Sequence, residues 1–497
     1  MTEPASFLIH DADVPNLRAV VSKLTGIGYS ESSVRDRLGL EDIGDLQWRA
    51  VPMYRAERLS SRDLLALAID LFLLQGALPT GEFDRLFSPS ERDVLVRAAV
   101  ITRDEMGVAR ARASLFPVGD CLIFSDHAWP ELPHPGYDSV PYDQVMSVGR
   151  DSRNLARCTI RQPFRSALDL CTGSGIHAVL ASAHSEQVLA VDINPRAAHC
   201  TRFNAQALGI TNLKVVVGDL FEILPNKRFD LITANPPFVP SPLGTLAFRD
   251  GGPSGEDIQK RIIASLPDHL EPGGIAQIVT ELGERDGEPL VHRLREWLNG
   301  AAMDIHILRL GEHSATQYAI GHAKGNDYQA FLDSTDQWAS NLRVQGYKRV
   351  VSLVISFQWS DAKCGTPWER VDESPPPLRK AGADIHATFL AERTTRHLDW
   401  LQSLSHNWVC RTGPVALFDA RVLGSDLPAK IKATLLGQAL RVEHQIDPVE
   451  LEILNRVEGR IVVSDLIAIF RCLRVDEPIV IAALRSLLRC KLIRVGE

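Results

Sequence analysis

Short apolar runs alternate with helix-like segments through the middle of the chain, from about residue 142 to residue 359. Two strands joined through a helix need a crossover connection, which makes them parallel members of one sheet. The alternation therefore predicts an α/β domain with a doubly wound, mostly parallel sheet. The expected strands in chain order are 166–170, 187–191, 214–217, 231–234, 275–280 and 304–310. Two more strand-like segments, 317–322 and 350–357, flank a helix expected over 327–342, and the pattern does not decide which of them completes the sheet.

The first part of the chain has a different pattern. Its apolar residues recur at helical spacing, as in the run Leu64-Leu65-Leu67-Ala68-Leu71-Phe72. Two strand-like segments, 108–115 and 121–124, follow and are joined by a short turn-forming stretch. We therefore expect a helical accessory domain over residues 1–140 that ends in a β-hairpin.

The last part of the chain also reads as mostly helical. Three short helices are expected over 448–457, 464–473 and 477–490, followed by a strand at 492–495, an order similar to that of a winged helix. The stretch DESPPPLRK before it is typical of a linker. The expected division of the chain is therefore an N-terminal accessory domain (1–140), a Rossmann-like domain (141–360), a linker (361–380) and a winged-helix-like C-terminal domain (381–497).

Composition excludes several classes of protein. With 45% hydrophobic and 23% charged residues, the chain is typical of folded globular proteins, and its formal net charge of −8 argues against a broad basic surface for nucleic acid. The first ten residues, MTEPASFLIH, lack the features of a signal peptide, and no apolar run is long enough to span a bilayer, so we expect a cytoplasmic protein. The eight cysteines contain no Cys-x-x-Cys pair, and we expect no metal site.

A glycine-rich turn follows the first strand of the α/β domain, in the stretch ALDLCTGSG. Gly173 and Gly175 permit a tight turn and a close approach of the backbone to a ligand, and Thr172 and Ser174 add hydroxyl groups. The stretch has no Gly-Lys-Ser or Gly-Lys-Thr sequence, so it is not an ATP-binding phosphate loop. By itself it predicts only a nucleotide-type ligand.

Acidic residues stand at the ends of the first three strands: Asp169, Asp192 and Asp219. Because parallel strands end at one edge of a sheet, we expect these side chains near the glycine-rich turn. A carboxylate at position 192 is suited to accept both hydroxyls of a ribose, and one at 219 to accept from an adenine amino group. Each acid alone could instead cap a helix.

The fourth strand ends in Asn235-Pro236-Pro237-Phe238. Proline fixes φ and has no N–H group, so this tetrapeptide continues neither a helix nor a central strand. In isolation it could simply terminate the strand. An amide, a carbonyl without a competing donor and an aromatic ring held in a stiff turn are also suited to bind a planar polar group.

Together these stretches resemble the class I S-adenosylmethionine-dependent methyltransferases. DLCTGSG, VDINPRA, GDLF and NPPF occur in the order of that family between Asp169 and Trp359, and DLCTGSG with NPPF is most similar to the HemK/PrmC and PrmB branch. The segment FRDGGPSGEDIQKRII also resembles the segment that follows the tetrapeptide in HemK-like enzymes. The resemblance implies a seven-stranded sheet and S-adenosyl-L-methionine as the cofactor. It implies cofactor-binding roles for Asp169, Cys171, Thr172, Gly173, Ser174, Gly175, Asp192, Ile193, Asn194, Asp219, Leu220 and Asn235.

The same resemblance implies catalytic roles for Asn235, Pro236, Pro237 and Phe238. The Asn235 side-chain oxygen and the Pro236 carbonyl together suit both hydrogens of a planar NH2 group, and would stabilise the charge that the nitrogen gains during methyl transfer. Phe238 is expected to stack on the planar acceptor. No strong general base is required, because the nitrogen becomes acidic as the methyl group is transferred.

The sequence does not identify the group that accepts the methyl. The resemblance implies a glutamine amide in a protein, or an exocyclic amino group of a nucleic-acid base. The terminal parts do not match the short helical domain of release-factor methyltransferases, so a small metabolite with an amide, amino or guanidino group is an alternative. A non-catalytic regulator that kept the cofactor fold is a more distant one.

Overall fold

The computed structural model describes residues 7–127, 143–244, 246–325, 327–361, 366–374, 380–396, 408–420, 430–435 and 443–496. The chain forms two compact units. The first contains Met1–Ala156, Arg161–Ala301 and Gly311–Ser356, and the second contains Arg157–Ile160, Ala302–Leu310 and Phe357–Glu497. The expected boundary near residue 140 lies outside the described residues, and the expected four-part division stays a prediction.

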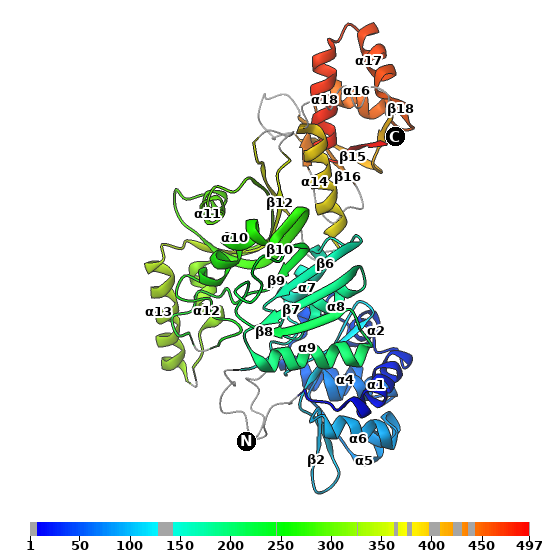
Figure 1. Ribbon diagram of the computed structural model, residues 1–497, viewed down its shortest axis with the longest axis vertical. Helices are drawn as coiled ribbons and strands as arrows, with labels where there is room; N and C mark the ends of the chain where they lie inside the picture. Colours follow the sequence, from blue (N-terminus) through cyan, green and yellow to red (C-terminus); the bar gives the residue numbers. More distant parts are fainter. Residues whose placement is uncertain are drawn as a thin grey trace. The chain divides into compact units, whose positions relative to one another are not determined.

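In the described part of the chain, the central feature is a sheet of eight strands, one more than the seven expected (Figure 1). Its strands are β6 (Phe164–Leu170), β7 (Ser185–Asp192), β8 (Leu213–Val217), β9 (Phe229–Ala234), β10 (Leu270–Glu284), β11 (Met303–Ser314), β12 (Arg349–Trp359) and β13 (Glu369–Glu373). The strand order is β13-β11-β12-β10-β9-β6-β7-β8. The neighbours from β8 to β10 pair in parallel, as do β11 and β13, which confirms the predicted mostly parallel α/β sheet.

Helices between these strands supply the crossovers. They are α8 (Ile176–Ser182), α9 (Pro195–Leu208), α10 (Asp257–His269) and α11 (Leu290–Trp297), and a further helix, α7 (Arg150–Cys158), precedes β6. Helix α9 shows why the sequence folds this way: Asn194 caps its first turn, Pro195 occupies the first helical position, and Gly209 ends it with φ +72°. Helix α8 packs on β6 and β7, and α9 on β7 and β8.

The strand-like segment 317–322 is a helix, so that alternative is wrong. Helix α12 (Ala315–His322) begins with a capping box in which Ser314 and Gln317 satisfy each other's backbone N–H groups. Helix α13 (Tyr328–Val344) follows, close to the helix predicted over 327–342. Segment 350–357 lies in β12 and is the one that joins the sheet. The two helices therefore form an insertion between β11 and β12.

The N-terminal part is helical, as predicted, with an added small sheet. Its helices are α1 (Val14–Gly26), α2 (Glu31–Leu38), α3 (Val51–Met53), α4 (Leu64–Phe72), α5 (Thr80–Leu86) and α6 (Pro89–Arg97), and its strands are β1 (Ala77–Leu78), β2 (Ile101–Arg103), β3 (Ala109–Ala111), β4 (Ser114–Val118) and β5 (Cys121–Ser125). The expected single strand over 108–115 is wrong. It divides because β3 pairs with β1 and β2, whereas β4 forms the hairpin with β5.

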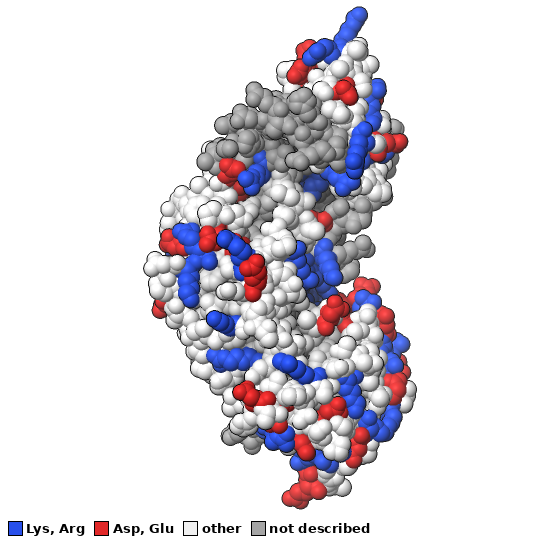
Figure 2. All heavy atoms as spheres, turned by 45° about the vertical axis from the view of Figure 1, so that its right-hand side comes forward, with Lys and Arg blue, Asp and Glu red and all other residues white. Residues whose placement is uncertain are grey.

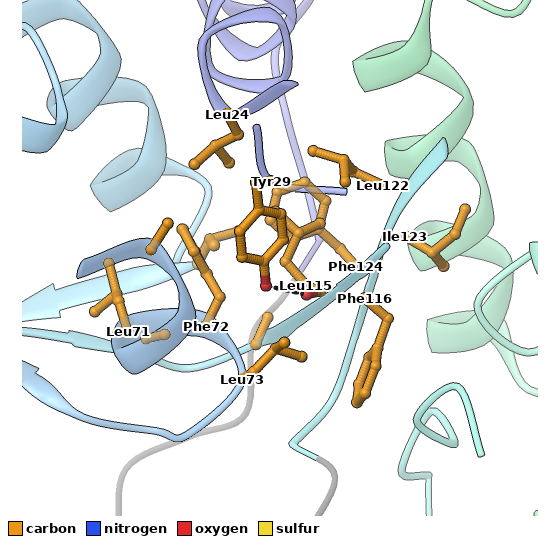
Figure 3. Close-up of a cluster of buried hydrophobic side chains, with 14 of the residues drawn as sticks. Leu24, Tyr29, Leu71, Phe72, Leu73, Leu115, Phe116, Leu122, Ile123 and Phe124 are labelled. Carbon is orange, nitrogen blue, oxygen red and sulfur yellow. Dashed lines mark hydrogen bonds between the residues drawn. The ribbon is translucent and has the colours of Figure 1, made fainter. Parts of the chain in front are cut away.

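The N-terminal part shares its hydrophobic core with α8 and α9. Figure 3 shows the centre of this core, where the Tyr29 hydroxyl donates to the Leu115 carbonyl at 2.7 Å. Phe124 of the hairpin packs edge-on against Phe203 of α9, with 5.2 Å between ring centroids. Next to it, the Asn204 side-chain NH2 donates to the carbonyls of Phe124 and Ser174, both at 2.8 Å. The hairpin is therefore tied to the glycine-rich turn through one amide.

The second unit contains more strands than predicted. Helices α14 (Gly382–Arg396), α16 (Pro448–Arg456), α17 (Val463–Cys472) and α18 (Glu477–Arg489) are joined by β14 (Trp408–Arg411), β15 (Val415–Ala420), β16 (Lys430–Leu435), β17 (Glu443–Gln445), β18 (Ile461–Val462) and β19 (Ile493–Gly496). The last three helices and β19 agree with the predicted segments, and the winged-helix assignment stays a prediction. The linker prediction is wrong for residues 369–373, which form β13 because they pair with β11. Residues 375–379 of the expected linker lie outside the described residues.

Charge is mixed on the surface. On the face in Figure 2, Lys and Arg alternate with Asp and Glu, in keeping with the net charge of −8. In the described part of the chain, no helix is long and apolar enough to cross a membrane.

Candidate active site

A cavity of about 330 Å³ lies at the carboxyl ends of β6, β7, β8 and β9. These four strands are neighbours in the sheet, so the segments that follow them meet at one edge. The predicted site residues that line the cavity are Cys171, Thr172, Gly173, Ser174, Asp192, Ile193, Asn194, Asp219, Leu220, Asn235 and Pro237. Four predicted residues are absent from its wall: Asp169, Gly175, Pro236 and Phe238.

The glycine-rich turn needs its glycines. Gly173 has φ +55° and Gly175 has φ +83°, in the left-handed region that side chains disfavour. A Cβ on Gly175 would lie 2.6 Å from the Thr201 methyl carbon of α9, so a side chain there would also push this helix away from the turn. Cys171, with φ +53°, adopts the same region without the freedom of glycine, a strained conformation of a kind found at functional sites.

Asp169 holds this turn from behind. One carboxylate oxygen accepts from the Thr172 hydroxyl at 2.6 Å and from the Ala178 N–H at 3.2 Å, and the other accepts from the Thr233 hydroxyl of β9 at 2.8 Å. The residue is 1% exposed, and burial raises the pKa of its carboxyl to about 7. Its position assigns it to the support of the turn rather than to direct contact with a ligand.

Asp192 lines the cavity with its carboxylate fixed by the backbone. It accepts from the N–H of Gly173 at 2.8 Å and from the N–H of Asn194 at 2.9 Å. Burial raises the pKa of Asp192, and these two hydrogen bonds oppose the rise. A carboxylate oxygen can accept more than one hydrogen bond, so Asp192 can still accept hydroxyl groups from a ligand. Ile193 beside it is 68% exposed and presents an apolar side chain to the same cavity.

Asp219 forms an ion pair that the sequence did not reveal. Its carboxylate lies 2.9 Å from the Arg261 guanidinium of α10, which also lines the cavity. Both side chains are partly exposed, so the pair contributes little to stability. The following residue, Leu220, has φ +48°. Asp219 therefore reaches the cavity edge, with one side of its carboxylate already occupied by arginine.

Asn235 is oriented by Ser152 of α7. The Asn235 NH2 group donates to the Ser152 hydroxyl at 3.1 Å, and both residues line the cavity. Because the amide is planar, this hydrogen bond fixes which side of it holds the carbonyl oxygen. Among the described residues, that oxygen accepts no hydrogen bond. The site thus contains one oriented acceptor atom, as the chemistry expected of Asn235 requires.

Phe238 lies away from the cavity wall. It is 7% exposed and packs in a cluster with Tyr318 of α12 and Trp338 of α13. Its expected stacking on the acceptor therefore finds no support in its position. Phe248 does line the cavity and is the aromatic residue there that is suited to such contact. Pro236 is buried, and Pro237 is partly exposed.

The GGPSG segment supports the tetrapeptide from the other side. A Cβ on Gly255, which has φ +76°, would lie 2.3 Å from the Phe238 carbonyl oxygen. A Cβ on Gly251 would lie 2.7 Å from the Pro237 carbonyl oxygen. Only glycine allows the two backbone segments to approach so closely. The Gly251 N–H also donates to the Val239 carbonyl at 3.0 Å, which fixes the two segments together.

Further cavity residues were not among the predicted site residues. They include Gln144, Val145, Met146, Ser152, His177, Leu246, Ala247, Asp250 and Ile258. His177 is 4% exposed and Gln144 is 6% exposed. Within the described chain, both His177 ring nitrogens and the Gln144 side-chain oxygen lack hydrogen-bond partners. Buried polar atoms without partners beside a cavity are suited to a polar ligand, so the cavity fits S-adenosylmethionine, which has charged amino and carboxylate groups.

Comparison with known proteins agrees with this geometry. Residues 147–285 match the family described as the methyltransferase small domain. The chain is 37% identical over 169 residues to the ribosomal protein uL3 glutamine methyltransferase of Bordetella pertussis, covering 30% of this chain and 56% of that protein. It is 31% identical over 166 residues to the release factor glutamine methyltransferase of Geobacter sulfurreducens, covering 30% of this chain and 58% of that protein.

A third relative is matched over most of its length. The "Putative protein N5-glutamine methyltransferase" of Methanocaldococcus jannaschii is 32% identical over 146 residues, which cover 28% of this chain and 73% of that protein. The chain spans little more than half the length of the two bacterial relatives. The matched region, 147–285 in the family comparison, contains the glycine-rich turn, the strand-end acids and the tetrapeptide. The chain therefore belongs to the HemK/PrmC branch of the class I S-adenosylmethionine-dependent methyltransferases.

Proposed function

We propose that this protein transfers a methyl group from S-adenosylmethionine to the side-chain amide nitrogen of a glutamine in a protein. The observation that carries the proposal is the Asn235 amide, which Ser152 orients at 3.1 Å in the same cavity as the glycine-rich turn. The names of the relatives, which are glutamine methyltransferases for a ribosomal protein and for release factors, support the same acceptor group.

Asn235 and Pro236 would position the acceptor. A primary amide presents two hydrogens in one plane, and the Asn235 side-chain oxygen, which lies at the cavity, would accept one of them. The Pro236 carbonyl stays the proposed acceptor of the other, although Pro236 is not among the residues that line the cavity. Holding both hydrogens directs the nitrogen toward the methyl group and stabilises the positive charge that the nitrogen gains. The proton then leaves to solvent. Phe248, which lines the cavity, is placed to contact the planar amide.

The cofactor would lie across the ends of four strands. When bound, S-adenosylmethionine would supply a sulfonium methyl group to the acceptor nitrogen, with the neutral thioether as the leaving group. Asp192 would accept the ribose hydroxyls, and Asp219, at the next strand end, would lie nearest the adenine. The turn from Cys171 to Gly175 would contact the remainder of the molecule, with Asp169 keeping the turn in place.

The proposed acceptors are of one class, namely proteins of the kind that the relatives methylate. The relatives that support it act, by their names, on a ribosomal protein and on release factors. With an acceptor of that kind, the proposed reaction would take place in the cytoplasm. The formal net charge of −8 gives no reason to prefer a nucleic-acid base, since such acceptors favour a clustered basic surface.

The test is methylation of defined acceptors with isotopically labelled cofactor. Ribosomal protein uL3 and a release factor, each purified from a strain lacking its own methyltransferase, would be incubated with the full-length protein and mapped by mass spectrometry. Label on a glutamine side chain, absent when that glutamine is replaced by asparagine and absent with Asn235→Ala, is the expected result. Label found only on free small amides or on an oligonucleotide would overturn the proposal.

A further inference from the structure

A buried glutamine lies beside the cavity, outside the methyltransferase motifs. Gln144 is 6% exposed and lines the cavity. Its side-chain NH2 group donates to the His127 carbonyl at 3.5 Å, which leaves the amide oxygen on the opposite side of the group. Within the described chain, this oxygen accepts no hydrogen bond. A buried acceptor without a partner destabilises a folded protein, so its place at a cavity indicates a ligand that donates to it.

The N-terminal part of the chain holds this glutamine in place. The backbone N–H of Val145, the next residue, donates to the Asp126 carboxylate at 2.8 Å. Asp126 directly follows strand β5 and also forms an ion pair with Arg196 of α9. The position of Gln144 is therefore fixed by the end of the N-terminal hairpin and by the helix after β7.

The segment from residue 143 to residue 152 spans one half of the cavity. At its start, the Asp143 carbonyl accepts from the Asn194 side chain at 2.8 Å, just after the end of β7. At its end, the Ser152 hydroxyl accepts from Asn235, just after the end of β9. Since the sheet order is β9-β6-β7-β8, the segment leads from β7 away from β8. It therefore covers the part of the cavity between the expected ribose and the acceptor, away from the adenine.

A buried histidine supplies a second polar group to the cavity. His177 is 4% exposed, lines the cavity and comes two residues after the glycine-rich turn. In the described part of the chain, neither of its ring nitrogens has a hydrogen-bond partner. Burial lowers the pKa of His177 to about 3, so at neutral pH the ring is uncharged. A neutral imidazole has one N–H donor and one acceptor, and the donor is suited to a carboxylate.

We propose that Gln144 and His177 recognise the amino-acid end of S-adenosylmethionine. The Gln144 side-chain oxygen accepts a hydrogen bond from the ammonium group, and the His177 ring donates one to the carboxylate. This assignment rests on the cofactor site of the proposed function and not on the identity of the methyl acceptor. It gives the N-terminal part of the chain a role in cofactor recognition, because that part positions Gln144.

Three thioethers that share the same adenosine separate the two contacts. S-Adenosylhomocysteine has both the ammonium and the carboxylate, its decarboxylated form has only the ammonium, and 5′-methylthioadenosine has neither. Isothermal calorimetry with the full-length protein measures the affinity for each. The wild-type protein should bind them in that order, and each missing group should weaken binding about tenfold or more.

The variant Gln144→Met keeps the length of the side chain and removes the acceptor. It should weaken the binding of S-adenosylhomocysteine and of its decarboxylated form about tenfold or more. Binding of 5′-methylthioadenosine should stay unchanged, which also shows that the cavity is still folded. The variant His177→Phe should weaken only S-adenosylhomocysteine. Asp192→Ala, at the expected ribose site, is the control that should weaken all three.

The variant Gln144→Glu keeps an acceptor oxygen, so it should bind the decarboxylated form at least as tightly as the wild-type protein. A loss of affinity for all three thioethers in Gln144→Met, or for none of them, would overturn the proposal. Equal affinity of the wild-type protein for S-adenosylhomocysteine and 5′-methylthioadenosine would overturn it too, without contradicting methyl transfer. A wild-type protein that binds none of the three would contradict the cofactor site as well.

Discussion

Ser152 decides how Asn235 presents its amide to the cavity, through one hydrogen bond of 3.1 Å. The variant Ser152→Ala frees the amide to rotate, and the loss of a neutral hydrogen bond of about 0.5–1.5 kcal/mol corresponds to a rate roughly 2- to 12-fold lower. Ser152→Thr keeps the hydroxyl and should restore the rate. Single-turnover methyl transfer at saturating cofactor measures the effect. A loss of cofactor affinity with an unchanged rate would contradict the positioning role.

Replacement of Asn235 itself should lower the rate of methyl transfer far more than replacement of Ser152. Asn235→Ala removes an acceptor from a nitrogen that gains positive charge, so turnover should fall about 10²- to 10³-fold, or roughly 2.7–4 kcal/mol, with little change in cofactor affinity. Asn235→Asp keeps an acceptor oxygen and should retain part of the activity. A rate for Asn235→Ala within about threefold of wild type, only ~0.7 kcal/mol in the barrier, would reduce the tetrapeptide to a turn.

Asp192 is the residue whose loss should be seen in binding rather than in turnover. Asp192→Ala removes hydrogen bonds to a charged group and should weaken S-adenosylmethionine binding by about 1.5–3 kcal/mol. The same carboxylate also accepts from the Gly173 N–H, so circular dichroism is needed to confirm that the fold persists. Isothermal calorimetry that shows an unchanged affinity would rule out the assignment of Asp192 to the ribose.

The residues of the site could be predicted only where a motif exposes them. Asp192, Asn235 and the glycine-rich turn gather at one edge because parallel strands end there, a consequence of chain topology that sequence spacing already contains. Ser152 lies in a segment without a distinctive pattern, and Phe248 begins the FRDGGPSGEDIQKRII segment but was not predicted as a site residue, so only the structure places both at the cavity. Packing likewise removed Phe238 from the position that its place in the motif suggested.

At the scale of elements, the close contact between the GGPSG segment and the tetrapeptide should be intolerant of a methyl group. Gly255→Ala adds a Cβ 2.3 Å from the Phe238 carbonyl oxygen, at φ +76°. Gly287→Ala is a matched control, since its φ is +74° and a Cβ there meets nothing within 4 Å. The control should cost about 1–2 kcal/mol, the price of a left-handed alanine.

The clash should make Gly255→Ala more costly than this control by at least ~1 kcal/mol, and should also reduce turnover, because the tetrapeptide must move. Unfolding in urea, followed by circular dichroism, compares the two variants. Equal midpoints with equal activity would mean that the two segments can separate without consequence for the site.

Elements with strong periodicity were predictable, and short ones were not. Strands β6 and β9 are mostly apolar and buried, which makes them recognisable in the sequence. Strand β13, with the sequence ERVDE, is mostly charged and becomes a strand only because β11 offers it a partner. Helix α12 is short, and its sequence alone resembles a strand. The capping box of Ser314 and Gln317 stabilises the first turn and favours the helix.

At the scale of the whole molecule, the second unit is not a detachable tail. It includes residues 302–310 from the middle of the chain together with residues 357–497. Inside it, His306 of β11 is fully buried, and its ring Nε2 lies 2.9 Å from a carboxylate oxygen of Asp372 in β13. The His306 ring also packs edge-on against Phe389 of α14, with 6.3 Å between the ring centroids. Deletion of residues 381–497 would remove Phe389 and expose this pair of strands.

We therefore expect the chain 1–380 to be poorly soluble or to unfold at a much lower temperature than the full protein. Differential scanning calorimetry of the two proteins, with S-adenosylmethionine affinity measured on any soluble fraction, provides the comparison. A truncated protein with an unchanged unfolding temperature and full cofactor affinity would show that the central sheet is complete without the second unit.

The hydrogen bonds of Asn204 couple the N-terminal hairpin to the turn that is expected to bind the ligand. One side chain joins the Phe124 backbone to the Ser174 carbonyl of the glycine-rich turn. A ligand that binds only the folded turn also favours every structure on which the turn depends. Amide hydrogen exchange in β4 and β5 should therefore slow when S-adenosylmethionine is added, although neither strand touches the cavity. Hydrogen exchange in the N-terminal part would then depend on whether the cofactor is bound. Mutations in this part, far from the site, would in turn change the affinity for S-adenosylmethionine.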